Sequence, residues 1–281
     1  MLSCTIDAKE NRDVGIVDFP NAFMQVDMDE TVHMKLEGKI AELLMKIDPD
    51  LYQPYVLTEN GKTVLYVELK KDLYGTPKAA LLFWKRLSSQ LLIKWDFKLN
   101  PYDTCVANKM IKGNQCTILW HVDNLKTSHV DEDAVTDKVI GLLEFEFGKE
   151  APLTKSRGKV HQFLGMIIDY SIPAGKVMFT MIDYIKSMLS DLPKDMDGTV
   201  PTPAASYLFE VDESATKLDE DISIMYHHNT ARLLFLCKRA RPNMQTTVAF
   251  CLLVSNLWIT TTTRSSDGRS SISEGHSCTC R

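Results

Sequence analysis

The chain has 281 residues, of which 44% are apolar and 25% are charged, and its formal net charge is −5. This length allows one large or two small domains with a sizeable core. No apolar run reaches the roughly 18 residues of a membrane-spanning helix, and the N-terminus has no basic region followed by an apolar one, as a secretory leader would. The seven cysteines lack metal-ligand spacing, which argues against a zinc site. Composition therefore predicts an intracellular globular protein with free thiols.

Positive charge is concentrated in one segment of this acidic chain. Residues 60–112 carry ten cations and four anions, a local excess of six positive charges. Such a segment is compatible with a nucleic-acid-binding face, although a solvated helix surface accounts for the same pattern. The cations are Lys62, Lys70, Lys71, Lys78, Lys85, Arg86, Lys94, Lys98, Lys109 and Lys112.

The N-terminal half is predicted to alternate strands and helices. Residues 1–11 have the composition of a helix end, and residues 13–19 form a strand that ends at Pro20, which lacks a backbone donor. Further along, the apolar periodicity predicts a helix over 37–47, a hairpin over 57–69 that turns at Asn60-Gly61, a helix over 78–94, and a hairpin that pairs 104–109 with 116–121.

The C-terminal half is predicted to be mainly helical. The pattern gives helices over 131–147, 181–192, 221–239 and 243–257, the last two separated at Arg241-Pro242. Between the first two helices, residues 160–170 and 176–179 read as the two strands of a hairpin. From residue 259 the composition changes to Thr, Ser, Gly and Arg without apolar periodicity, so we expect disorder there.

Two carboxylates lie where predicted strands end. Asp123 falls at the tip of the hairpin within Ile118–Lys126, and Asp18 ends the strand that precedes Pro20. Asp and Asn are also ordinary turn residues, so either position has a purely structural interpretation. Two strand-end carboxylates far apart in sequence can nevertheless meet in one sheet and share Mg²⁺, which prefers oxygen ligands. We therefore expect their carboxylate oxygens to lie about 3 to 6 Å apart.

Four motifs in order resemble the reverse transcriptase domain of copia-type LTR retrotransposons, across residues 1–257. They are Asp18-Phe19-Pro20-Asn21-Ala22-Phe23, Leu73-Tyr74-Gly75 with Lys78-Ala79, His121-Val122-Asp123-Asn124, and Phe163-Leu164-Gly165-Met166. The resemblance implies an α+β fold of the right-hand polymerase type, with an antiparallel palm sheet backed by helices. It assigns residues 1–180 to a palm that lacks most of the fingers, residues 181–257 to thumb or connection helices, and residues 258–281 to a tail.

The resemblance also implies an RNA-directed DNA polymerase that uses two Mg²⁺ ions, with Mn²⁺ as a substitute. Asp18 and Asp123 would bind the metal, and Asn124 stands where the family has a second Asp. The nucleotide-binding positions would be Phe19, Phe23, Gly75 and Lys78, and the primer grip would be Phe163, Leu164, Gly165 and Met166. Its partners would be an RNA template, a DNA primer and a dNTP, with integrase and ribonuclease H in an intact element. It would be located in a cytoplasmic virus-like particle or the nucleus.

Several interpretations remain open from sequence alone. Phe23 also suits a core position, the 78–94 helix a core helix, and Phe163–Met166 a buried strand. Asn124 and the missing fingers predict that this copy polymerises poorly, so a catalytically dead relic that at most binds RNA–DNA duplex is one alternative. A Mg²⁺-dependent phosphohydrolase that uses Asp18 and Asp123 is another.

The C-terminal tail has the character of a frameshift product. Read one nucleotide earlier, with permitted codon choices, residues 259–279 become a sequence that resembles the family's next helix, which ends in Lys-Tyr-Leu-Arg-Gly-Thr. The coding DNA tests this hypothesis.

Overall fold

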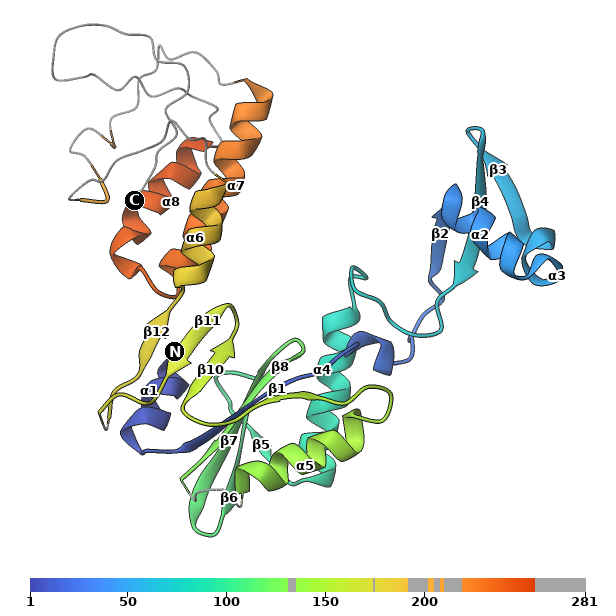
Figure 1. Ribbon diagram of the computed structural model, residues 1–281. Coiled ribbons are helices and arrows are strands. Elements are labelled where there is room, and N and C mark those ends of the chain that lie inside the picture. The colour runs from blue at the N-terminus through green and yellow to red at the C-terminus, as the bar shows by residue number, and fades with distance from the viewer. Residues whose placement is uncertain (131–134, 174, 192–201, 205–207, 210–218, 256–281) are drawn as a thin grey trace, which may run out of the picture. The chain divides into compact units, whose positions relative to one another are not determined.

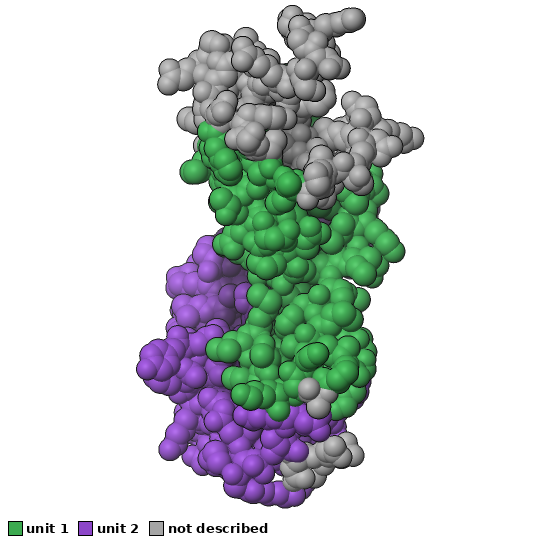
Figure 2. All heavy atoms as spheres, turned by 90° about the vertical axis from the view of Figure 1, so that its left-hand side faces the viewer, with its two compact units in different colours: residues 1–9, 159–281 green, residues 10–158 purple. Residues whose placement is uncertain are grey.

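The computed structural model describes residues 1–130, 135–173, 175–191, 202–204, 208–209 and 219–255 (Figure 1). The chain divides into two compact units, residues 10–158 and residues 1–9 with 159–281, which Figure 2 shows in purple and green. Both units combine helices with antiparallel sheets, which confirms the predicted α+β class. In the described part of the chain no helix is both long enough and apolar enough to cross a membrane. The predicted tail over 258–281 lies outside the described residues.

A six-stranded antiparallel sheet dominates the unit of residues 10–158. Its order is β5 (Lys98–Leu99), β6 (Val106–Ile111), β7 (Asn114–His121), β8 (Asn124–His129), β1 (Asp13–Asp18) and β9 (Thr154–Ser156). The predicted strand over 13–19 and the predicted hairpin over 104–121 are both confirmed.

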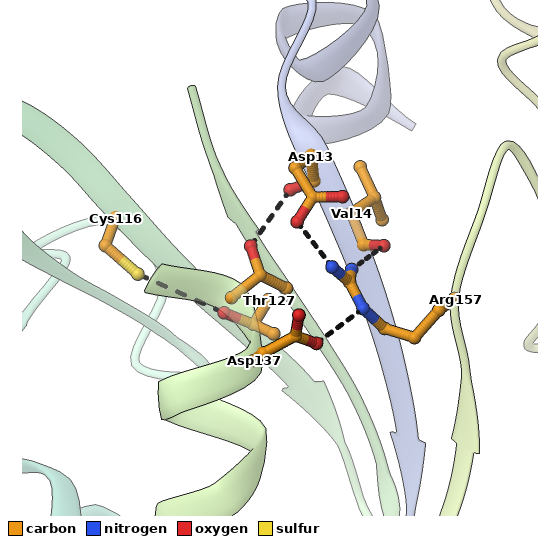
Figure 3. Close-up of polar contacts among 7 residues, drawn as sticks. Asp13, Val14, Cys116, Thr127, Asp137 and Arg157 are labelled. Carbon is orange, nitrogen blue, oxygen red and sulfur yellow. Dashed lines mark hydrogen bonds and ion pairs between the residues drawn. The ribbon is translucent and has the colours of Figure 1, made fainter. Parts of the chain in front are cut away.

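Helix α5 (Val135–Phe147) packs against β1 and β8. The approach is close at Gly15, where an added Cβ would lie only 2.7 Å from the Cδ1 of Ile140. Arg157 ties the same elements together, because its guanidinium bonds Asp13 at 2.6 Å, the carbonyl of Val14 at 2.6 Å and Asp137 of α5 at 2.9 Å (Figure 3).

Helix α4 (Ala79–Ser89) continues as a π-helical turn, η3 (Gln90–Lys94), which confirms the helix predicted over 78–94. The two sides of this helix differ in exposure, since Leu81 is 48% exposed and Phe83 is 1% exposed. Phe83 determines which side of α4 faces the core, because its ring packs edge-on against Phe19 and Phe147, with centroids 5.4 and 6.2 Å away.

A second, three-stranded sheet has the order β2 (His33–Glu37), β4 (Lys62–Glu68), β3 (Val56–Glu59). The predicted turn at Asn60-Gly61 is confirmed, and both residues have the positive φ that a two-residue hairpin requires. Helix α2 (Lys39–Ile47) begins two residues later than predicted, because Glu37 ends β2, a strand that was not predicted. Helix α3 (Pro49–Tyr52) and two short 3-10 turns, η1 (Phe23–Gln25) and η2 (Gln53–Tyr55), complete this part.

The unit of residues 1–9 and 159–281 contains α1 (Leu2–Lys9) and a sheet of β10 (Val160–Phe163), β11 (Met166–Asp169) and β12 (Met178–Thr180). The prediction of one strand over 160–170 was wrong. Leu164 and Gly165, both with positive φ, turn this segment into a hairpin of its own. Pairing of β11 with β12 confirms the second, predicted hairpin.

The described residues after β12 form three helices, α6 (Ile182–Ser190), α7 (Glu220–Cys237) and α8 (Gln245–Ser255), with the 3-10 turn η4 (Pro242–Met244) between the last two. They confirm the predicted helices and the break at Arg241-Pro242. Their core is rich in Met and Leu, with Met188, Leu233, Leu236 and Met244 buried together.

Candidate active site

Three polar residues, Asp18, Asp123 and Asn124, lie at one end of the β1–β8 pair, where β1 ends and β8 begins. The register of these antiparallel strands places Asp18 directly opposite Asn124. Asp123 belongs to the two-residue turn that joins β7 to β8, because His121 pairs with Asn124 across it. The backbone N–H of Phe19 donates to the carbonyl of Asp123 at 2.9 Å, which fixes the chain after β1 against this turn. The two predicted carboxylates are therefore brought to the same end of paired strands.

The turn itself is strained at Val122. Its φ is +57°, a region that Gly and Asn enter easily but a β-branched residue enters only at a cost. Such conformations cost about 1–3 kcal/mol and persist only where the surroundings impose them. Here the paired strands and the bond from Phe19 impose the conformation, which keeps Asp123 at the tip.

The electrostatics of the pair favour a cation. Burial raises the pKa of Asp18 above its ordinary value, and the negative charge of Asp123 raises it further. A divalent ion between two carboxylates would remove this repulsion, and Mg²⁺ is commonly held by one or two carboxylates. The amide oxygen of Asn124 is a neutral oxygen donor at the same place. The donor set thus fits Mg²⁺ or Mn²⁺, with Asp18 and Asp123 as the residues that would hold it.

Tyr74 is a member of the site that sequence reasoning missed. Its Oη donates a hydrogen bond to Oδ2 of Asp123 at 2.9 Å, while Nδ2 of Asn124 donates to Oδ1 at 3.0 Å. Partial burial, this hydrogen bond and the charges of Asp123 and Asp18 raise the pKa of Tyr74 to about 12. The only sequence signal that pointed to Tyr74 was its place before Gly75 in the Leu73-Tyr74-Gly75 motif.

The two predicted aromatic positions differ in their surroundings. The side chain of Phe19 is 1% exposed and packs edge-on against Phe83 and Phe147, so only its backbone faces the site. Phe23 is 5% exposed, and its ring centroid lies 4.4 Å from that of Tyr74. The core position considered for Phe23 is thus confirmed, and Phe23 also contacts a residue bonded to Asp123.

Lys78, expected to bind nucleotide, is held by acidic neighbours. Its Nζ lies 2.7 Å from Glu30 and 3.4 Å from Asp29. Gly75, also expected to bind nucleotide, has a φ of +100°, which glycine adopts without steric cost. Other cations of the basic segment are also paired: Lys62 with Glu37, Lys70 with Glu68, and Lys71 with Asp27. Exposed pairs of this kind contribute about 0–1 kcal/mol, so a phosphate could compete for these cations.

The predicted primer-grip residues belong to the other unit. Phe163 and Met166 are buried, and Leu164-Gly165 form the hairpin turn. The Cα of Gly165 is close enough to α7 that an added Cβ would lie 3.4 Å from the ring of Phe235.

Among the described residues, no group of three or more His, Cys, Asp or Glu side chains is arranged to hold a metal ion. The candidate site therefore consists of the pair of carboxylates and their neutral neighbours. No protein-family model matches this chain. No curated protein matches it significantly.

Proposed function

We propose that this chain is the palm-containing part of a copia-type RNA-directed DNA polymerase with weakened nucleotidyl transfer. The observation that carries the proposal is that Asp18 and Asp123 lie at the same end of the β1–β8 pair. The order of the four sequence motifs supports the same assignment, because each of these carboxylates lies in one of the motifs.

Each residue of the site would have a defined task. Mg²⁺ or Mn²⁺, when bound, supplies charge neutralisation for the attacking and leaving oxygens of phosphoryl transfer. Asp18 and Asp123 hold the ions, and the exposed ring of Tyr74, which packs on Phe23, offers an aromatic surface beside them for a nucleotide sugar. A DNA primer, an RNA template and a dNTP are the corresponding partners, with integrase and ribonuclease H elsewhere in the polyprotein.

The weakening follows from Asn124. An amide in this position carries no charge, and its Nδ2 donates to Oδ1 of Asp123. Ion binding would therefore depend on two carboxylates where the family has three. The same observation favours a second candidate, a relic that has lost the reaction altogether.

Single-nucleotide extension of a primer on an RNA template separates these candidates. We expect slow templated addition in Mn²⁺ by the wild type and none by Asp18→Ala or Asp123→Ala. Asn124→Asp should recover metal affinity but add little nucleotide by itself, and a grafted fingers segment together with Asn124→Asp should restore addition. Failure of the wild type, and of Asn124→Asp carrying a grafted fingers segment, to add a nucleotide would identify the relic. Hydrolysis of dNTP without templated addition would contradict the polymerase assignment in favour of a phosphohydrolase.

A further inference from the structure

We propose that Tyr74 is a positioning residue, whose phenol holds the Asp123 carboxylate in the orientation from which Asp123 and Asp18 bind a divalent cation. The inference rests on the proposed function in one respect, namely that these two carboxylates bind such an ion.

The hydrogen bonds of Asp123 leave room for a metal ion. Among the described residues, each carboxylate oxygen of Asp123 has one donor, Tyr74 on Oδ2 and the Asn124 amide on Oδ1. An ionised carboxylate has about four lone-pair sites, so each oxygen keeps one for a cation. Two donors from different elements fix the plane of the carboxylate, which a single donor would leave free to rotate.

Tyr74 is itself held in place on its apolar side. Its ring lies against Phe23, and the Phe23 ring packs edge-on against Phe83 of the core, with centroids 6.4 Å apart. Moving the phenol away from Asp123 would therefore break an aromatic contact. Tyr74 is 59% exposed, so such a fixed position would not be expected of an ordinary surface tyrosine.

The backbone around Tyr74 is fixed by a buried carboxylate. Leu73 to Thr76 form a turn closed by the N–H of Thr76 on the carbonyl of Leu73 at 3.2 Å, and Gly75 has the positive φ of the third position of a type II turn. Asp72, fully buried, accepts from the N–H of Leu73 at 2.8 Å and from the hydroxyl of Thr76. Tyr74 is thus the exposed second residue of a turn whose backbone is held by hydrogen bonds.

Donors that orient a metal-binding side chain have a characteristic effect. Their removal lowers metal affinity about 10- to 100-fold, because the ligand must be reoriented when the ion binds. The loss depends on the ion. Mg²⁺ requires near-ideal octahedral geometry, whereas Ca²⁺ accepts flexible coordination. A positioning role for Tyr74 therefore predicts a larger loss for Mg²⁺ than for Ca²⁺.

Titration calorimetry of the full chain with Mg²⁺ and with Ca²⁺ tests the inference. Tyr74→Phe keeps the ring on Phe23 and removes only the phenol oxygen. We expect its dissociation constant for Mg²⁺ to rise about tenfold or more, and that for Ca²⁺ to rise less. Tyr66→Phe is the matched control, because Tyr66 also donates to a carboxylate, that of Glu59 at 3.0 Å, in the other sheet of the unit. Its affinities should equal those of the wild type.

A second variant protects the test against misfolding of the first. Thr76→Val removes the hydroxyl bonded to Asp72 and leaves Tyr74 intact, and we expect a smaller loss in the same direction. Equal losses for both ions, or an unchanged or higher Mg²⁺ affinity in Tyr74→Phe, would overturn the positioning role. If Asp123→Ala abolished binding while Tyr74→Phe did not weaken it, this inference alone would fail. Absence of Mg²⁺ and Ca²⁺ binding in the wild type would overturn the proposed function as well.

Discussion

Asn124 and Asn114 occupy equivalent positions in two neighbouring hairpins, each directly after a two-residue turn. Asn124 follows Val122-Asp123 and pairs with His121, whereas Asn114 follows Lys112-Gly113 and pairs with Ile111. The two asparagines share this pairing across a turn, but only Asn124 adjoins the carboxylate pair. This difference permits a controlled test of the charge at the site.

Asn124→Asp should lower stability without divalent ions and raise divalent-ion affinity. The change removes the hydrogen bond to Asp123 and adds a third negative charge beside Asp18. Melting temperatures with and without Mn²⁺ measure both effects, and Mn²⁺ should stabilise the variant more than it stabilises the wild type. Asn114→Asp should show neither change. Equal responses of the two variants to Mn²⁺ would argue against a metal site at Asp123.

Val122→Asn should stabilise the chain by about 0.5–1 kcal/mol. Asn tolerates the positive φ of this position, and part of the gain is lost with the apolar contacts of the half-buried Val122. Denaturant unfolding measures the change. Lys112→Asn, at a positive φ in the neighbouring turn, is the control and should gain less because lysine is not β-branched. A loss of more than about 1 kcal/mol in Val122→Asn would show that packing exceeds backbone strain here.

Arg157→Ala should destabilise the chain by about 2 kcal/mol, because it removes charge-assisted hydrogen bonds to Asp13, Asp137 and the Val14 carbonyl. Lys70→Ala removes an exposed ion pair with Glu68, at 2.8 Å, and should change stability by less than about 1 kcal/mol. Urea unfolding compares the two. Similar values for both would mean that Arg157 does not anchor α5 to β1.

Cys116 should make unfolding depend on pH above the ordinary thiol range. Burial raises its pKa from 9.0 to about 11, so the folded chain keeps the thiol neutral where the unfolded chain ionises it. The resulting stabilisation is complete below pH 9 and is lost as pH rises towards 11, a change of about 2–3 kcal/mol. Unfolding free energies of wild type and Cys116→Ala across this range measure it. A difference between them that does not vary with pH would contradict the prediction.

Local signals predicted much of the fold. The Asn60-Gly61 turn, the β-forming run before Asp18 and the hairpin ending at Asp123 are specified by neighbouring residues, and all three are present. Strand β2 was missed because only Met34 and Leu36 mark it as a strand. The turn at Leu164-Gly165 was missed because leucine rarely adopts a positive φ.

The site was predictable only where its residues lie at strand ends. Asp18 and Asp123 could be paired because strands bring distant ends together. Tyr74 could not, because its partner is 49 residues away and the bond depends on a turn held by buried Asp72. The interior position of Phe19 likewise depends on Phe83 and Phe147, which come from two separate helices.

The position of the Phe19 ring between Phe83 and Phe147 makes the acidic end of β1 sensitive to changes deep in the hydrophobic interior. Asp18 immediately precedes Phe19 in the chain, and the backbone N–H of Phe19 itself donates the hydrogen bond to Asp123. A substitution that empties or overfills this aromatic triad would shift that backbone, although it touches no ionisable group. Substitutions in the hydrophobic core that only alter packing would thus also alter the positions of Asp18 and Asp123.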